Sequence, residues 1–256
     1  VRRWLAGEHR SLKSEAARTQ LQELLPVLLE QFARMDNPDA ALIPFDDFLA
    51  NLNNAPRLLS MLRQNPSLVS LIATLIGTAP RLADTLARTP QVMDALVEPH
   101  FFGILPDEAA LSQRLQLALA QARYDEDLLE RIRMFGLEHM FLIGVRIITG
   151  TVTAAQAGET FAKLADIVIR AVHRAVADNF AQAYGHLRSE ASAVLALGKL
   201  GGNEMTATSD LDLIVVYDFD DTNPESDGAR SLYGAQYFAR LTQRLINALT
   251  AQTNYG

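Results

Sequence analysis

Apolar residues recur at helical spacing over most of the first 185 positions. The clearest early case lies between Ser14 and Met35, where one face carries Leu21, Leu24, Leu25, Leu28, Leu29 and Phe32. Intervals of three and four residues are typical of an amphipathic helix. Pro26 lies inside this stretch, and its missing N–H predicts a kink or a division into two helices. The N-terminal region is therefore expected to be helical.

Prolines mark the next boundaries. The stretch 53–56, Asn-Asn-Ala-Pro, is predicted to end a helix. Pro66, Pro80 and Pro90 each precede apolar residues at helical spacing. Proline is favoured at the first helical position because the missing N–H has no partner there. We expect short helices after these prolines and a loop over 98–106, and the unequal proline spacing argues against a true repeat.

Three longer helices are predicted farther along the chain. The first covers residues 107–122, with an aspartate suited to cap its start, and the second covers 125–149. The third covers 153–184 and begins with a capping box, in which Thr153 and Gln156 bond each other's backbone amides. These stretches leave little room for strands before residue 185.

Short apolar runs follow this helical region. Residues 194–197 and 211–217 have strand length, and glycines lie between them. Asp210 and Asp212 stand at the start of the second run. Because residues i and i+2 of a strand point to the same face, both carboxylates are expected to project together. An acidic loop and an amphipathic helix over 232–250 are predicted to follow.

The aspartates and the glycines together suggest a metal–nucleotide site. Two neighbouring carboxylates repel each other unless a cation lies between them, and Mg²⁺ binds one or two carboxylates together with substrate phosphates. The glycines Gly201-Gly202 allow close approach to a ligand, and successive N–H groups in such a turn bind anions. Each feature alone is more often a plain turn or a solvated strand end. Their combination indicates phosphoryl or nucleotidyl transfer.

The order strand, Gly-Gly, seven residues, Asp-Leu-Asp, apolar strand resembles the signature of the DNA polymerase beta-type nucleotidyltransferase superfamily. Residues 198–204 and 209–214 more closely resemble the bacterial glutamine synthetase adenylyltransferase family, the adenylylating/deadenylylating enzymes. Four other segments resemble the same family, namely 36–42, 65–68, 90–96 and 236–245. The resemblance covers nearly the whole chain.

The resemblance implies transfer of AMP from ATP to a tyrosine of glutamine synthetase, which regulates nitrogen assimilation. It implies that Asp210 and Asp212 are catalytic and hold Mg²⁺. The residues implied to bind the nucleotide are Gly201, Gly202, Ser209 and Lys199. A solvated turn lysine and a serine that caps the turn remain the plainer interpretations of Lys199 and Ser209.

Several alternatives stay open. The family's enzyme has two catalytic halves with this motif; one adds AMP and the other removes it by phosphorolysis. The preceding helices look more like those before the C-terminal, adenylylating half, so we predict that half, with the deadenylylating half as the alternative. Outside the family, the alternatives are another nucleotidyltransferase, of the aminoglycoside or uridylyl type, or a non-catalytic module that docks a partner. A PII-type signalling protein is a partner implied by the family alone.

The predicted fold class is α+β and predominantly helical. A helical region, 1–185, precedes a polymerase beta-type nucleotidyltransferase core, 186–256, with a small mixed sheet. The superfamily carries a third carboxylate on a later strand, and the family segment that would hold it has no counterpart before Gly256. The core is therefore predicted to be incomplete at its C-terminal end, and the chain to be a fragment that does not catalyse the transfer alone.

Composition limits the partners. The 256 residues carry a net charge of −7, which argues against nucleic-acid binding because such surfaces are basic. The absence of cysteine excludes disulfides and thiolate metal sites. No apolar run reaches the roughly 18 residues of a membrane span, and no signal peptide is recognisable. A cytoplasmic protein without a membrane partner is predicted.

Overall fold

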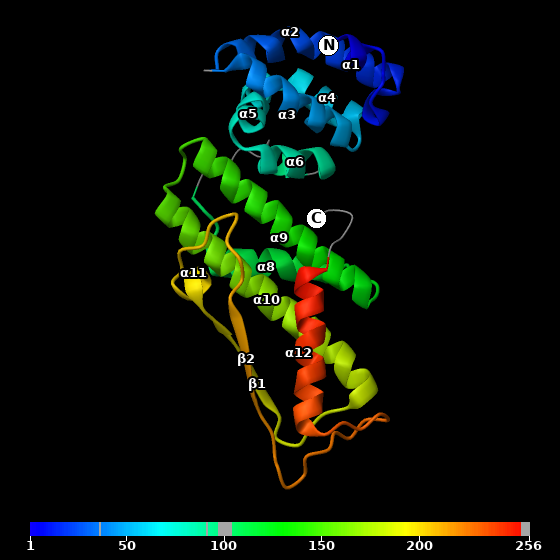
Figure 1. Cartoon of the computed structure of the whole chain (residues 1–256), viewed down its shortest axis with the longest axis vertical. Coiled ribbons are helices and arrows are strands. Elements are labelled where there is room, and N and C mark those ends of the chain that lie inside the picture. The colour runs from blue at the N-terminus through cyan, green and yellow to red at the C-terminus, as the bar shows by residue number, and fades with distance from the viewer. Residues whose placement is uncertain (36, 91, 97–103, 252–256) are drawn as a thin grey trace. The chain divides into compact units, whose positions relative to one another are not determined.

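In the computed structural model of the chain, the described residues are 1–35, 37–90, 92–96 and 104–251. They are predominantly helical with one small sheet, which confirms the predicted fold class (Figure 1). The chain divides into two compact units, which are Val1–Gly103 with Gly144–Thr151, and Ile104–Ile143 with Val152–Asn254. Each unit is described by itself.

The first unit is helical throughout its described residues. Its elements are α1 (Arg2–Leu5), the 3-10 helix η1 (Arg10–Leu12), α2 (Glu15–Ala33), α3 (Pro38–Asn51), α4 (Ala55–Gln64), α5 (Pro66–Thr78), α6 (Pro80–Arg88) and α7 (Val92–Leu96). Ser14 caps α2, because its side chain accepts a hydrogen bond of 3.2 Å from the amide of Ala17. Pro26 lies inside α2 and does not divide it.

Two of the three predicted proline starts are confirmed, and Pro56 marks a further helix start. Pro66 and Pro80 are the first residues of α5 and α6, as expected, whereas α7 begins at Val92, after Pro90. The stretch 53–56 does more than end a helix, because α4 already starts at Ala55, with a proline in its first turn. A missing N–H is harmless there, so one short segment can separate two helices without a loop. Of the predicted loop 98–106, residues 98–103 lie outside the described residues.

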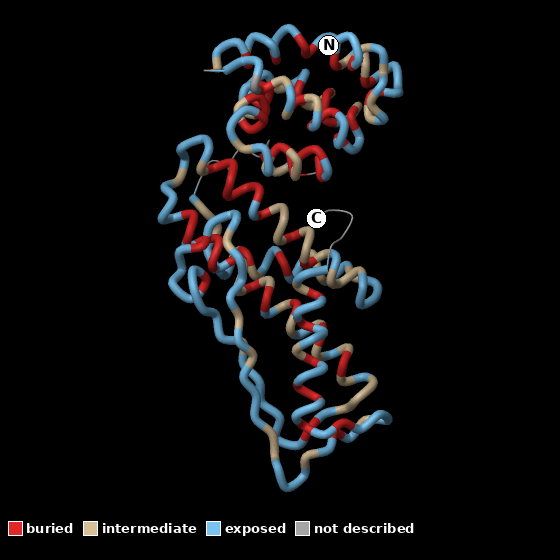
Figure 2. The backbone as a smooth tube through the Cα atoms, viewed as in Figure 1, coloured by how far each residue is buried: buried red, intermediate tan, exposed pale blue. Residues whose placement is uncertain are grey.

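Aromatic and aliphatic side chains fill the core of the first unit. The side chain of Phe45 in α3 is buried, and its ring centroid lies 5.1 Å from that of Trp4 and 5.4 Å from that of Phe32. Figure 2 shows buried positions recurring along the longer helices of the first unit. In the described parts of both units, no helix carries an apolar stretch long enough to cross a bilayer.

The second unit combines long helices with the strands. Its elements are α8 (Glu108–Leu119), α9 (Asp125–Ile148, which ends in the first unit), α10 (Ala154–Tyr184), β1 (Ala191–Ala196), α11 (Gly198–Gly201), β2 (Leu213–Asp218) and α12 (Gly234–Thr250). Asp107 caps α8 by accepting from the amide of Ala110 at 2.8 Å. The capping box of Thr153 and Gln156 starts α10. Both predicted helix starts are confirmed.

The two strands pair antiparallel, with Leu195 opposite Ile214. Among the described residues no parallel pair accompanies them, so the observed sheet is antiparallel rather than mixed. One face packs on α12, where the rings of Tyr217 and Phe238 stack with centroids 4.5 Å apart. The other face carries Leu195 and Ile214, which are exposed. The sheet therefore contacts a helix on one face, leaves apolar side chains exposed on the other, and buries none of its residues.

The compact units differ from the predicted domains. The helices α8 and α10 and most of α9 belong to the same unit as the sheet, whereas a boundary near residue 185 would separate them from it. Residue 185 does mark the end of the helical region, since α10 ends at Tyr184 and β1 follows. The assignment of 1–185 and 186–256 as separate domains stays a prediction.

Candidate functional site

The helix α10 supports the segment that joins the two strands. A Cβ placed on Gly158 of α10 would lie 3.3 Å from the carbonyl oxygen of Met205, so the segment lies directly against the helix. Met205 and Leu200 are each 6% exposed and anchor the segment through apolar contact. The segment is therefore supported by α10 around Leu200 and Met205.

The predicted glycine turn is a single helical turn, α11. The amide of Gly201 donates to the carbonyl of Leu197, and the amide of Gly202 donates to that of Gly198, each at 3.0 Å. The left-handed residues are Gly198, with φ +53, and Asn203, with φ 56, rather than the two predicted phosphate-binding glycines. In this conformation both predicted amide donors serve the turn itself. Phosphate binding by Gly201 and Gly202 stays a prediction.

Asp210 and Asp212 lie just before β2, which begins at Leu213, two residues later than predicted. The amide of Leu197 donates to the carbonyl of Asp212 at 2.9 Å, which holds Asp212 at the end of the strand pair. Both aspartates are exposed, and within the described chain neither carboxylate has a hydrogen bond or an ion pair. Two such carboxylates are available to a cation from solution.

The two aspartates offer few ligands to a metal ion. Within the described residues, no group of three or more His, Cys, Asp or Glu side chains could bind a metal ion. Zn²⁺ takes three or four protein ligands and does not fit. Mg²⁺ keeps several waters and takes one or two carboxylates with substrate phosphates. Two carboxylates are the number and kind of ligand that Mg²⁺ takes, and magnesium binding by Asp210 and Asp212 stays a prediction.

The two polar residues of the predicted nucleotide site differ in their surroundings. Lys199 is exposed on α11. The Ser209 side-chain oxygen accepts from the amide of Thr206 at 2.9 Å and lies 2.9 Å from the Thr206 hydroxyl oxygen. Ser209 thus caps the turn, the plainer of its two interpretations. A role of Lys199 and Ser209 in phosphate binding stays a prediction.

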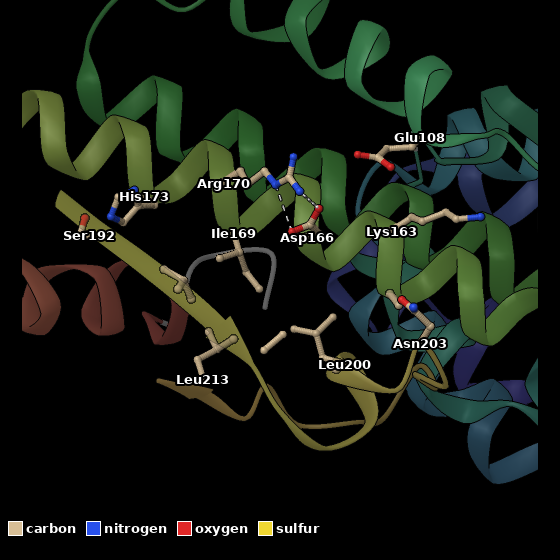
Figure 3. Close-up of a pocket in the computed structure, with 14 residues that line it drawn as sticks. Glu108, Lys163, Asp166, Ile169, Arg170, His173, Ser192, Leu200, Asn203 and Leu213 are labelled. Carbon is tan, nitrogen blue, oxygen red and sulfur yellow. Dashed lines mark hydrogen bonds and ion pairs between the residues drawn. The ribbon is translucent and has the colours of Figure 1, made fainter. Parts of the chain in front are cut away.

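A cleft of about 650 Å³ lies between α10 and the strands (Figure 3). Its walls include Ile169 of α10, Leu213 of β2 and Gly201 of α11. Inside it, Arg170 and Asp166 form an ion pair with 2.8 Å between Nη2 and Oδ2. The residues that line the cleft do not include either aspartate of the motif. Of the predicted site residues, only Gly201 lines the cleft.

Sequence reasoning missed one residue of the site, Gly198. A Cβ placed on it would lie 2.4 Å from Oδ2 of Asp212, so the two residues are in direct contact. The available signal was a glycine at the end of a strand run, ahead of the Gly201-Gly202 pair. The contact itself depends on how β1 and β2 pair, which no local pattern reveals.

The chain is similar to proteins of one known family. A protein-family model described as glutamate-ammonia ligase adenylyltransferase matches residues 69–256. The chain is 52% identical to a protein of Bradyrhizobium sp., 51% to one of Rhodopseudomonas palustris and 55% to one of Xanthobacter autotrophicus. Each of the three is named bifunctional glutamine synthetase adenylyltransferase/adenylyl-removing enzyme.

These matches extend over the whole chain but over only part of each relative. All of the chain is covered, whereas the chain spans 26% of each relative's length. The family model covers well over half of the chain, including both strands, the glycine turn and the two aspartates. The chain therefore belongs to the glutamate-ammonia ligase adenylyltransferase family.

Proposed function

We propose that this chain provides the metal–nucleotide site for the transfer of AMP from ATP to a tyrosine of glutamine synthetase. The observation that carries the proposal is the pair Asp210 and Asp212, exposed and without a counter-charge in the described chain, next to the turn α11. Family membership supports the use of ATP. The names of the relatives support glutamine synthetase as the protein acted on.

The chain's own residues have separate parts in this proposal. Asp210 and Asp212 hold Mg²⁺ through their carboxylates, and Lys199 offers a positive charge to the triphosphate from α11. Gly201, Gly202 and Ser209 would bind the nucleotide's phosphates. A magnesium ion held by these two carboxylates would supply positive charge to offset the charge that develops on the phosphates during transfer. Contact with α10 supports the segment that carries these groups.

The adenylylating half is the one proposed. What favours it is the likeness of the preceding helical segments to those before the C-terminal half of the family's enzymes. The alternative is the half that removes AMP by phosphorolysis, and the relatives' name includes both activities. A PII-type signalling protein is proposed as a partner, and this rests on the family resemblance alone. The proposed location is the cytoplasm.

The proposal also requires a third carboxylate. In the superfamily this group lies on a later strand, and the relatives are about four times as long as this chain. We therefore expect activity only in a full-length enzyme that contains this segment, and weak metal–nucleotide binding in the segment by itself. Binding and transfer must be measured on these two proteins separately.

The proposal is tested by incubating the full-length enzyme with glutamine synthetase and ATP labelled in the α-phosphate. Label should enter glutamine synthetase without added phosphate. Asp210→Asn and Asp212→Asn should each lower the rate at least about 100-fold without unfolding the protein, because each removes a ligand of the metal. Asp221→Asn, in the exposed acidic loop after β2, is the matched control and should transfer AMP at the normal rate.

Two results would count against the proposal. Normal turnover by Asp210→Asn or Asp212→Asn would show that the substituted aspartate is not needed for AMP transfer. Release of ADP from adenylylated glutamine synthetase in phosphate, blocked by the same substitutions while labelling continues, would assign this segment to the deadenylylating half. On the segment itself, a melting temperature that Mg-ATP does not change would argue against nucleotide binding.

A further inference from the structure

Gly198 lies where the chain leaves β1, directly beside the carboxylate of Asp212. Its φ of +53 is in the left-handed region, where L side chains are strained. A Cβ placed on Gly198 would lie 2.4 Å from Oδ2, 3.4 Å from Cγ and 3.7 Å from Cβ of Asp212. The carboxylate therefore occupies the space that any side chain at position 198 would need.

Backbone hydrogen bonds keep the two residues at this distance. Ala196 pairs with Leu213 at the end of the sheet, and the amide of Leu197 donates to the carbonyl of Asp212 at 2.9 Å. On the other side, the carbonyl of Gly198 accepts from the amide of Gly202 in α11. Because both backbones are tied to regular structure, neither can move away freely when the space between them is filled.

The orientation of the Asp212 carboxylate depends on that free space. Within the described residues, no hydrogen bond or ion pair fixes the carboxylate in one rotamer. Steric exclusion by the neighbouring backbone then decides which staggered rotamers are open to it. We propose that Gly198 is a positioning residue, whose missing side chain lets the Asp212 carboxylate take the orientation in which it binds the metal with Asp210. The inference rests on the proposed function, in which Asp212 is a metal ligand.

Gly198→Ala tests the proposal. The atom in contact is the far end of an exposed side chain, so we expect the carboxylate to rotate away and the fold to persist. The affinity for Mn²⁺, which shares the preference of Mg²⁺ for carboxylate oxygens, should fall at least about tenfold. Affinity is measured on this chain by water proton relaxation with Mn²⁺ alone. A merely structural role would not change this readout in a folded variant.

Gly150→Ala is the matched control for backbone strain. Gly150 also has a positive φ, +69, but a Cβ placed on it would meet no atom within 4 Å. A left-handed alanine should raise the unfolding equilibrium constant about 5- to 30-fold in either variant. Only Gly198→Ala should also weaken Mn²⁺ binding, because only there does the new methyl group meet a metal ligand.

Asp212→Ala distinguishes a failure of the proposed function from a failure of the positioning role of Gly198. It removes the carboxylate but leaves a Cβ, which would be 3.7 Å from the new methyl group, an ordinary contact. In this background Gly198→Ala should cause no further loss of Mn²⁺ affinity. Unchanged affinity in Asp212→Ala alone would contradict the proposed function. A loss in Asp212→Ala but none in Gly198→Ala would contradict only the positioning role.

The test also covers a variant that fails to fold. If Gly198→Ala is unfolded by circular dichroism, the double variant with Asp212→Ala is examined in the same way. Restored folding supports the contact, because removing the carboxylate has removed the obstruction. Continued unfolding of the double variant, with Asp212→Ala alone folded, overturns the proposal.

Discussion

The first helical unit and the two-stranded sheet of the second unit differ in how far they bury their apolar side chains. Phe45 in the first unit is 1% exposed, whereas Leu195 and Ile214, opposite each other on the sheet, are 46% and 48% exposed. The first unit buries its apolar faces among its own helices. One face of the sheet contacts α12 and lines the cleft beside α10, the other faces solvent, and no residue of either strand is buried. The strands that precede and follow the site segment therefore gain their order mainly from the ladder between them.

The largest expected effect compares large-to-small substitutions in the two regions. Phe45→Ala should lower the free energy of unfolding by about 3–5 kcal/mol, because it leaves a cavity in a closed core. Ile214→Ala should lower it by less than about 1 kcal/mol, because much of that side chain is already in water. Urea unfolding followed by circular dichroism measures both.

A second pair controls for the difference in residue type. Leu25→Ala in α2 removes a buried leucine, and Leu195→Ala removes an exposed one of the same size. The buried variant should lose about 2–5 kcal/mol and the exposed one clearly less. Equal losses in the two regions would show that the bare sheet face is covered in solution, and the comparison would fail.

The same division explains which elements could be predicted from sequence. The starts of α8 and α10 were predictable because their signals are local; Asp107 and Thr153 each accept from an amide three residues ahead. α4 was missed because the Ala55-Pro56 dipeptide was interpreted only as an end. A proline serves equally well after one helix and inside the first turn of the next.

The site was predictable in composition but not in conformation. The spacing of Asp210 and Asp212 indicated two carboxylates at a strand end, and both are there and exposed. The sequence could not decide whether the Gly201-Gly202 turn is open or helical, because glycine permits both. The contact of Leu200 with its surroundings and the pairing of β1 with β2 decide it, and both are non-local.

The next expected effect concerns a His–carboxylate pair in the first unit. Asp46 accepts from Nε1 of Trp4 at 2.6 Å and lies 2.7 Å from Nε2 of His9. These hydrogen bonds, first that of Trp4, lower the pKa of Asp46 below its ordinary value. The stabilisation is therefore present above the ordinary carboxyl pKa and is lost as pH falls through the lowered one. Asp46→Asn should cost about 1 kcal/mol at neutral pH and less at about pH 3.

Urea unfolding at both pH values measures this difference. Asp47→Asn, at the exposed neighbouring position, is the control and should change the free energy of unfolding by less than about 0.5 kcal/mol. A cost of Asp46→Asn that is equal at neutral and acidic pH would show that the side chain acts through its shape and not through its charge.

The smallest expected effect concerns the corresponding pair in the second unit. Nδ1 of His186 lies 2.8 Å from Oε1 of Glu190, and this hydrogen bond raises the pKa of His186. A raised pKa stabilises the fold below the ordinary histidine value, and the stabilisation is lost as pH rises through the raised one. Both side chains are partly in water, so the free energy of unfolding should fall by only a few tenths of a kcal/mol between about pH 6 and 8.

His186→Gln should abolish this fall, whereas Arg188→Gln, at a nearby exposed position, should keep it. A fall in the wild type that matches the one expected for Asp46 would mean that exposure does not distinguish the two pairs.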